Sequence, residues 1–176
     1  MTPNEQHHVK AVGQKLKDVK ALLDAAVLSE TAPMSEWLSC LIAMKEIVGN
    51  PHNDVNTVAC LMAKDYLCRK LAMRDYDALA KAHGAKGLDI DEQTVDGQRV
   101  IAEIKTTGAF GHKDIRQPQR DAILEDFHRL YTAKADHRYF FVVDGDVFAI
   151  IKRKYLAHTP GIVLVLVSTG EEFIAG

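Results

Sequence analysis

The sequence predicts an α/β domain in which helices flank a mixed β-sheet and a helical half precedes it. Apolar residues recur at helical spacing as far as Met73. From Gly84 onward, short β-rich runs separated by turn signals dominate. The 176 residues are 47% hydrophobic and 26% charged, which are ordinary globular proportions. We therefore expect one domain, with residues 1–52 as its helical part and residues 53–176 as its core.

Three helices are expected in the N-terminal half, because residues that cap or stop helices interrupt the apolar pattern. We place them at residues 9–28, 35–48 and 53–73, with Ser35 capping the second and Asn53 or Asp54 capping the third. The expected apolar stripes are Val12, Leu16, Val19, Leu22 and Leu23 in the first helix and Val55, Val58, Ala59, Met62 and Tyr66 in the third.

The second half alternates strands with one helix. A hairpin is expected where residues 88–91 and 98–107 flank Val95-Asp96-Gly97. A helix over residues 115–134 has Pro118 in its first turn. Its apolar face consists of Ile123, Phe127, Leu130 and Tyr131. Further strands are expected at residues 139–143, 147–151 and 162–167, the first two joined by a turn at Asp144-Gly145-Asp146.

Composition argues against several classes of protein. The 22 Lys and Arg against 24 Asp and Glu are unlike the strong basic excess of proteins that coat nucleic acid without specificity. The longest apolar run, residues 162–167, is far shorter than the roughly 20 residues of a membrane-spanning helix. The first eight residues lack the apolar segment of a signal peptide, and the three cysteines include no closely spaced pair. We therefore expect a cytoplasmic protein without membrane association.

The turn of the hairpin determines which charged residues meet. A two-residue turn would put Asp89 and Glu103 on opposite faces. A three-residue turn, with Gly97 in the left-handed conformation, would instead place Asp89 directly across from Glu103. Because side chains alternate along a strand, Lys105 and Asp91 would then share the face of both acids.

Two carboxylates that face each other across a hairpin repel unless a cation lies between them. A hard ion such as Mg²⁺ takes one or two carboxylates and completes its shell with water and phosphate oxygens. Such an ion lowers the pKa of its bound water and neutralises charge in the transition state. Lys105 can orient that water or stabilise the phosphate. Asp89, Glu103 and Lys105 on one face therefore favour Mg²⁺-dependent hydrolysis of a phosphodiester.

The motif Gly87-Leu88-Asp89-Ile90, followed by Glu103-Ile104-Lys105-Thr106-Thr107, resembles the PD-(D/E)XK nuclease superfamily. That superfamily includes type II restriction endonucleases, Holliday-junction resolvases and repair nucleases. The order of helix, hairpin, helix and strand over residues 53–167 resembles its core, and Leu88 replaces the proline of the motif. Among the branches of the superfamily, the chain most resembles restriction endonucleases, because its helical N-terminal half is extended and it lacks a strong basic excess. The resemblance implies a restriction-endonuclease-like core.

The resemblance implies roles for individual residues. Asp89 and Glu103 would ligate Mg²⁺ together with the main-chain carbonyl of Ile104. Lys105 would position or activate the attacking water, and cleavage would leave a 5′-phosphate and a 3′-hydroxyl.

Other polar residues have less definite roles. Asp91 is most simply a solvated acid at a strand end, with metal ligation as the alternative. Some members of the superfamily add an acid from the preceding helix, for which Glu46 and Asp54 are the candidates. The residues expected to contact DNA follow the catalytic strand and are Lys113, Arg116, Gln119 and Arg120.

These observations together predict a Mg²⁺-dependent restriction endonuclease that cuts double-stranded DNA. A palindromic site is matched by a two-fold homodimer, for which apolar surface on the N-terminal helices would supply the interface. Two alternatives stay open. One is a junction resolvase or repair nuclease that reads DNA shape, and the other is a catalytically silent DNA-binding or assembly module on the same fold.

Overall fold

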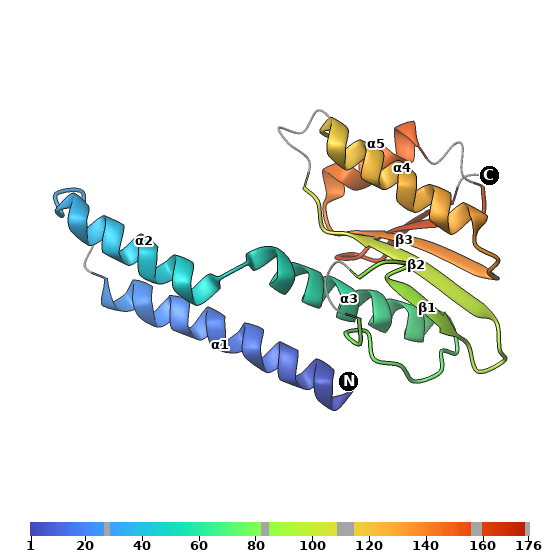
Figure 1. Ribbon diagram of the computed structural model, residues 1–176, viewed down its shortest axis with the longest axis horizontal. Coiled ribbons are helices and arrows are strands. Elements are labelled where there is room, and N and C mark those ends of the chain that lie inside the picture. The colour runs from blue at the N-terminus through green and yellow to red at the C-terminus, as the bar shows by residue number, and fades with distance from the viewer. Residues whose placement is uncertain (27–28, 82–84, 109–114, 156–159, 175–176) are drawn as a thin grey trace.

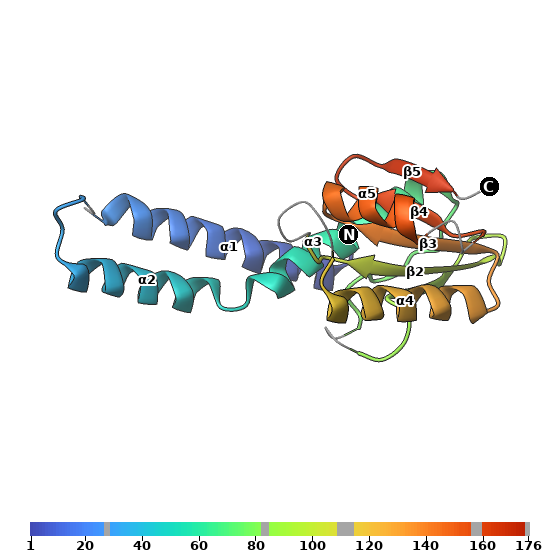
Figure 2. The same cartoon turned by 90° about the horizontal axis from the view of Figure 1, so that it is seen from above.

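The computed structural model describes residues 1–26, 29–81, 85–108, 115–155 and 160–174 (Figures 1 and 2). Its helices are α1 (Pro3–Ala25), α2 (Met34–Val48), α3 (Pro51–Lys70), α4 (Gln117–Thr132) and α5 (Gly145–Lys154). Its strands are β1 (Ile90–Gln93), β2 (Arg99–Lys105), β3 (His137–Val142), β4 (Val163–Leu166) and β5 (Glu171–Ile174). Within the described ranges, no helix has both the length and the apolar character that crossing a membrane requires.

The five strands form one mixed sheet and follow each other in chain order. β2, β3 and β4 are parallel, and β1 and β5 pair antiparallel with the outer two of them. Right-handed crossovers between consecutive parallel strands place their helices on the same face. Figure 1 accordingly shows α4 and α5 above the sheet and α3 below it. The prediction of an α/β fold with a mixed sheet flanked by helices is confirmed.

Each face of the sheet carries its own hydrophobic core. On the α3 side, Ala59, Ala63 and Leu67 pack against strand residues that include Ala102 and Phe141. The core on the other side contains Ile101, Phe140 and Leu164 from the strands, Phe127 and Leu130 from α4, and Phe148 and Ile151 from α5. Because helices cover both faces, the last four residues of β3 are all buried, as is typical of a central parallel strand.

Two helices begin at residues other than those predicted. α2 begins one residue before Ser35 and no side chain caps it, so the assignment of Ser35 as its cap is wrong. α3 begins with Pro51 in its first turn, where a missing N–H costs nothing. Asn50 caps it by accepting a hydrogen bond from the main-chain N–H two residues later, at 3.1 Å. Asn53 and Asp54, the predicted caps, lie inside the helix.

The largest departure from the predicted elements is α5. Residues 147–151 form a helix and not a strand, and Asp144 caps it by accepting a hydrogen bond from the N–H of Val147 at 2.9 Å. The buried residues recur at helical spacing and are Val147, Phe148, Ile150 and Ile151. Because β3 and β4 are parallel, they require a crossover connection, which a hairpin turn cannot supply.

The short strand β5 is absent from the predictions. It is an edge strand in which Phe173 is the residue that packs against the core, so its sequence carries little alternation. The predicted hairpin strands, the helix over residues 115–134 and the strands at 139–143 and 162–167 correspond to β1, β2, α4, β3 and β4 with small shifts of their ends.

The α1–α2 hairpin, which we call the arm, projects away from the sheet (Figures 1 and 2). Near its N-terminus, α1 is held to the body of the protein by Glu5, which is fully buried. Its Oε1 accepts hydrogen bonds from Nζ of Lys64 and from the N–H of Ala78, both at 2.9 Å. At the other end of the arm, Gly49 and Asn50 alone separate α2 from α3.

Parts of the predicted apolar stripes are exposed. In α3, the buried residues are Thr57, Ala59, Ala63, Tyr66 and Leu67. Val55, Val58 and Met62 expose 45%, 42% and 37% of their surface instead. In α1, Leu16 and Leu23 are exposed as well. The prediction that Val55, Val58 and Met62 are buried is wrong for the single chain, because α3 turns other residues toward the sheet.

Candidate active site

The β1–β2 hairpin has the register expected from a three-residue turn. Ile90 pairs with Ala102, and the N–H of Thr94 donates a hydrogen bond to the carbonyl of Gln98 at 2.9 Å. Gly97 has a φ of 82°, in the left-handed region that glycine adopts without steric cost. The register predicted for this turn is confirmed.

Asp89 immediately precedes β1 and is level with Glu103 in this register. Its Oδ2 accepts a hydrogen bond from the N–H of Ile104 at 2.8 Å, so the carboxylate takes the place of a strand partner at the edge of β2. The N–H and C=O of a residue in an extended strand point to the same side. The carbonyl of Ile104 is therefore directed toward Asp89 as well.

Glu103 is a buried acid, with 3% of its surface exposed. Its Oε1 accepts a hydrogen bond from Nε of Arg129 on α4 at 3.0 Å. Burial and the charges of Asp89 and Asp126 raise the pKa of Glu103, and Arg129 lowers it, so that the pKa is about 8. The three acids Asp89, Glu103 and Asp126 outnumber the two cations beside them, Arg129 and Lys105, which is the electrostatic setting that an added cation relieves.

Lys105 lies two residues beyond Glu103, on the same face of β2. Its ammonium group pairs with Oδ2 of Asp126, which is 2% exposed, and Arg129 pairs with Oδ1 of the same aspartate. Burial raises the pKa of Asp126, against the lowering effect of Lys105 and Arg129. Through these contacts α4 holds the side chains of Glu103 and Lys105.

Asp126 and Arg129 are functional candidates that the sequence analysis missed, although a signal was present. Asp126 falls three residues after Ile123 and four before Leu130, within the apolar face of α4. Charged residues are seldom fully buried unless they are paired, so an acid at such a position indicates a partner. Tyr131, predicted on this face, is exposed instead.

The other acids considered lie apart from this cluster or are already paired. Both carboxylate oxygens of Asp91 accept hydrogen bonds from Arg99 at 2.8 Å, and this arginine lowers the pKa of Asp91. Asp54 forms an ion pair with Lys15 at 2.9 Å on the α3 side of the sheet. Glu46 is exposed on α2, in the arm. The structure therefore brings none of the three together with the candidate site.

The residues expected to contact DNA lie where α4 begins. Lys113 is outside the described residues. Arg116 is the exposed N-cap of α4, and Gln119 and Arg120 are half-buried in its first turns. At 1.5 Å per residue, α4 extends about 13 Å from Asp126 to its N-terminus. Because α4 runs antiparallel to β2, these residues lie beyond the strand end that carries Lys105 and do not contact Glu103.

The donor set fits Mg²⁺ with few protein ligands. In the part of the chain that the structure describes, no three or more His, Cys, Asp or Glu side chains are arranged to hold a metal ion. The available donors are the carboxylates of Asp89 and Glu103 and the carbonyl of Ile104. Mg²⁺ commonly binds through one or two carboxylates and keeps several waters, whereas metals held in closed sites need more protein ligands.

Comparison with known proteins provides no evidence on the family or the activity of this chain. No family model matches the chain, and no curated protein or solved structure matches it significantly. The activity is therefore inferred from the residues of this chain.

Proposed function

We propose that this protein is a Mg²⁺-dependent endonuclease that hydrolyses DNA phosphodiester bonds, with a restriction-endonuclease-like core of the PD-(D/E)XK type. The observation that carries the proposal is the register of the β1–β2 hairpin. It sets Asp89 level with Glu103, and Lys105 follows on the same face of β2. Two acids and a lysine thus share one edge of the sheet, at the carboxyl end of a strand where ligands of α/β proteins commonly bind.

The proposed metal ligands are Asp89, Glu103 and the carbonyl of Ile104. When bound, Mg²⁺ would supply an acidified water and neutralise charge on the phosphate. Glu103 can keep Arg129 on Oε1 while it presents Oε2, which forms no hydrogen bond with the described residues. Arg129 thereby fixes the orientation of a carboxylate that would otherwise rotate.

Lys105 is the residue proposed to act on the attacking water. Its amine lies on the face of Glu103, where it can donate a hydrogen bond to that water or to a phosphate oxygen. The buried carboxylate of Asp126 holds the amine in place through an ion pair. Asp126 is therefore a positioning residue, because it acts through Lys105.

Double-stranded DNA is the proposed substrate. Arg116, Gln119 and Arg120 follow the catalytic strand on the first turns of α4, and such side chains and helix N-termini are common phosphate contacts. Cutting both strands of a symmetric site requires two catalytic centres. We therefore propose that the enzyme acts as a homodimeric restriction endonuclease.

Incubation of the full chain with DNA of known sequence, in Mg²⁺ and in EDTA, tests the proposal. We expect discrete fragments in Mg²⁺ whose ends a DNA ligase rejoins without prior phosphorylation. Glu103→Gln and Lys105→Ala should abolish this cleavage. Glu92→Gln is the matched control, because Glu92 lies on the same hairpin but on the opposite face, and it should cut as the wild type does.

The other outcomes identify the alternatives. Cleavage restricted to branched DNA would indicate a resolvase or repair nuclease. DNA binding without any cleavage would indicate a silent module, in which the ion pairs of Glu103 and Lys105 with α4 are purely structural. Undiminished cutting by Glu103→Gln would overturn the catalytic assignment.

A further inference from the structure

The arm has almost no core of its own. In α1 and α2, which are 23 and 15 residues long, the buried residues are Glu5 and Cys40. Helices in proteins are stabilised mainly by packing an apolar face against another element. The arm therefore leaves a large part of its apolar surface without a neighbour among the described residues.

α2 is apolar on two sides. One side is buried or half-buried and consists of Trp37, Cys40, Met44 and Ile47. The other exposes 71%, 60%, 57% and 48% of the surface of Met34, Leu38, Leu41 and Ile42, respectively. A helix that is apolar on more than one side is typically buried between several neighbours. In the described structure α2 packs against α1.

α1 carries a matching exposed stripe. Val9, Leu16 and Leu23 expose 39%, 67% and 49% of their surface and are spaced seven residues apart. Seven-residue spacing of apolar residues is the pattern of helices that pack side by side along their length. Both helices of the arm are thus patterned for a further helical partner.

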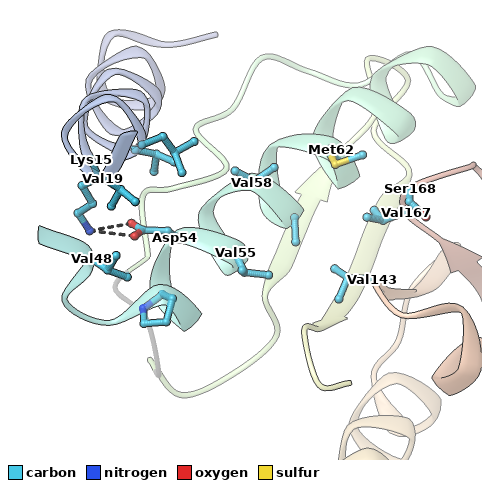
Figure 3. A pocket seen from close by; sticks show the side chains of 14 residues that line it. Lys15, Val19, Val48, Asp54, Val55, Val58, Met62, Val143, Val167 and Ser168 are labelled. Carbon is cyan, nitrogen blue, oxygen red and sulfur yellow. Dashed lines mark hydrogen bonds and ion pairs between the residues drawn. The ribbon is translucent and has the colours of Figure 1, made fainter. Parts of the chain in front are cut away.

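The exposed surface continues into a groove at the base of the arm (Figure 3). The groove has a volume of about 440 Å³ and lies between α1, α3 and the residues that follow β3 and β4. Its α3 wall contains Val55, Val58 and Met62, and Val143 and Val167 approach from the sheet. The residues of α3 that were predicted to be buried therefore border the same apolar surface as the arm.

We propose that the arm packs against the arm of a second copy of this chain, forming a four-helix bundle. The charges beside the stripes favour a second copy. The exposed charges that form no ion pair with the described residues have opposite net signs on the two helices: Lys10, Lys17 and Asp18 on α1, and Glu36, Lys45 and Glu46 on α2. Placing α1 of one copy against α2 of the other brings opposite charges together, and a two-fold axis repeats the match.

The size of this face is suited to a dimer. The 23 and 15 residues of the two helices correspond to about 35 Å and 22 Å of helix roughly 10 Å wide, so one side of the arm covers on the order of 600 Å². Stable interfaces bury about 800 Å² per partner, and the groove adds to the area of the arm. This inference rests on the proposed function, because it names the surface through which the proposed homodimer forms. The test of the interface measures molecular mass and does not depend on DNA cleavage.

Light scattering after size exclusion, over a dilution series of the full chain, tests the interface. The wild type should elute with twice the 19.5 kDa mass of one chain. Leu38→Glu puts a charge into the bundle twice and should raise the dissociation constant by roughly a hundredfold or more. Leu124→Glu is the matched control, because Leu124 is an exposed leucine on α4, and it should remain dimeric. Circular dichroism should show unchanged helix content in both variants.

A charge-exchange experiment tests the choice of partner. Lys10→Glu with Lys17→Glu makes both helices acidic, and Glu36→Lys with Glu46→Lys makes both basic. Each double variant alone should dimerise more weakly than the wild type, and an equimolar mixture of the two should recover the dimer.

Several results would overturn this inference: a monomeric wild type at every concentration, a Leu38→Glu variant that stays dimeric, or a mixture that fails to pair. A dimer that depends on Leu38 but does not cut DNA would sustain the interface and refute the proposed nuclease. Cleavage of DNA by a protein that stays monomeric would sustain the proposed nuclease and refute the interface.

Discussion

Replacement of Glu103 by Gln should stabilise the metal-free protein while it removes the response to Mg²⁺. Glu103 is buried beside Asp89 and Asp126, and burial raises its pKa from 4.5 to about 8 despite the hydrogen bond from Arg129. A carboxyl whose pKa is raised by folding costs no stability below pH 4.5, and its cost grows as the pH rises toward 8. At pH 7 this amounts to roughly 3 kcal/mol. Gln removes that cost and retains an oxygen for Arg129.

Magnesium should remove most of the difference in stability between the two proteins. A ligand present at about 100 times its dissociation constant stabilises the folded state by about 2.7 kcal/mol. The wild type should gain this amount, because the ion offsets the charges of Asp89 and Glu103, and Glu103→Gln should gain much less. Glu92→Gln, on the opposite face of the hairpin, should respond to Mg²⁺ as the wild type does.

Urea denaturation followed by circular dichroism, at pH 5 and pH 7 and in EDTA or Mg²⁺, measures both effects. A wild type whose midpoint is the same in EDTA and in Mg²⁺ would refute the metal site. A Glu103→Gln variant no more stable than the wild type in EDTA at pH 7 would refute the charge balance inferred for Glu103.

Three further predictions concern residues around the site and the arm. Asp126→Asn loses the ion pair that holds Lys105 and should lower kcat by roughly 10- to 100-fold with a smaller change in KM, measured by steady-state cleavage. Glu5→Gln should destabilise the protein by roughly 2–3 kcal/mol at neutral pH in urea denaturation. Although burial opposes it, hydrogen bonds from Lys64 and from the N–H groups of Ala78 and Thr2 lower the pKa of Glu5, so the stabilisation exists above about pH 4.5. The difference between Glu5→Gln and the wild type should therefore shrink as the pH falls below that value, and a constant difference would contradict the assignment. Arg116→Ala should weaken DNA binding at all sequences and reduce the slope of log K against log salt by about 1, measured by fluorescence anisotropy, whereas an unchanged slope would exclude a phosphate contact.

The hairpin could be predicted from sequence because its geometry is set within a few residues. Gly97 suits a two-residue or a three-residue turn, which limits the hairpin to two registers, and the structure has the one that carries Asp89 to the level of Glu103. The identity of α5 could not be decided in this way. Its apolar residues suit a strand or a helix, and the decision depends on β3 and β4 being parallel, a property of distant chain segments.

The candidate site likewise combines residues that local sequence identifies with residues that only the tertiary structure brings in. Asp89, Glu103 and Lys105 belong to one hairpin and are recognisable from their spacing. Asp126 and Arg129 join them because α4 packs across β2, and that docking is a long-range event. Likewise, periodicity identified Leu16 and Val55 as apolar but could not tell whether they contact the same chain or another.

The junction between α2 and α3 is short enough to act as a mechanical constraint. Gly49, with a φ of 61°, ends one helix, and Pro51 starts the next, so two residues alone link the arm to the helix beneath the sheet. In a dimer joined through its arms, the angle at this junction would set the distance between the two active sites. The offset between the cleavage positions on the two DNA strands would then depend on this junction. Insertion of a glycine after Gly49 should make that offset variable.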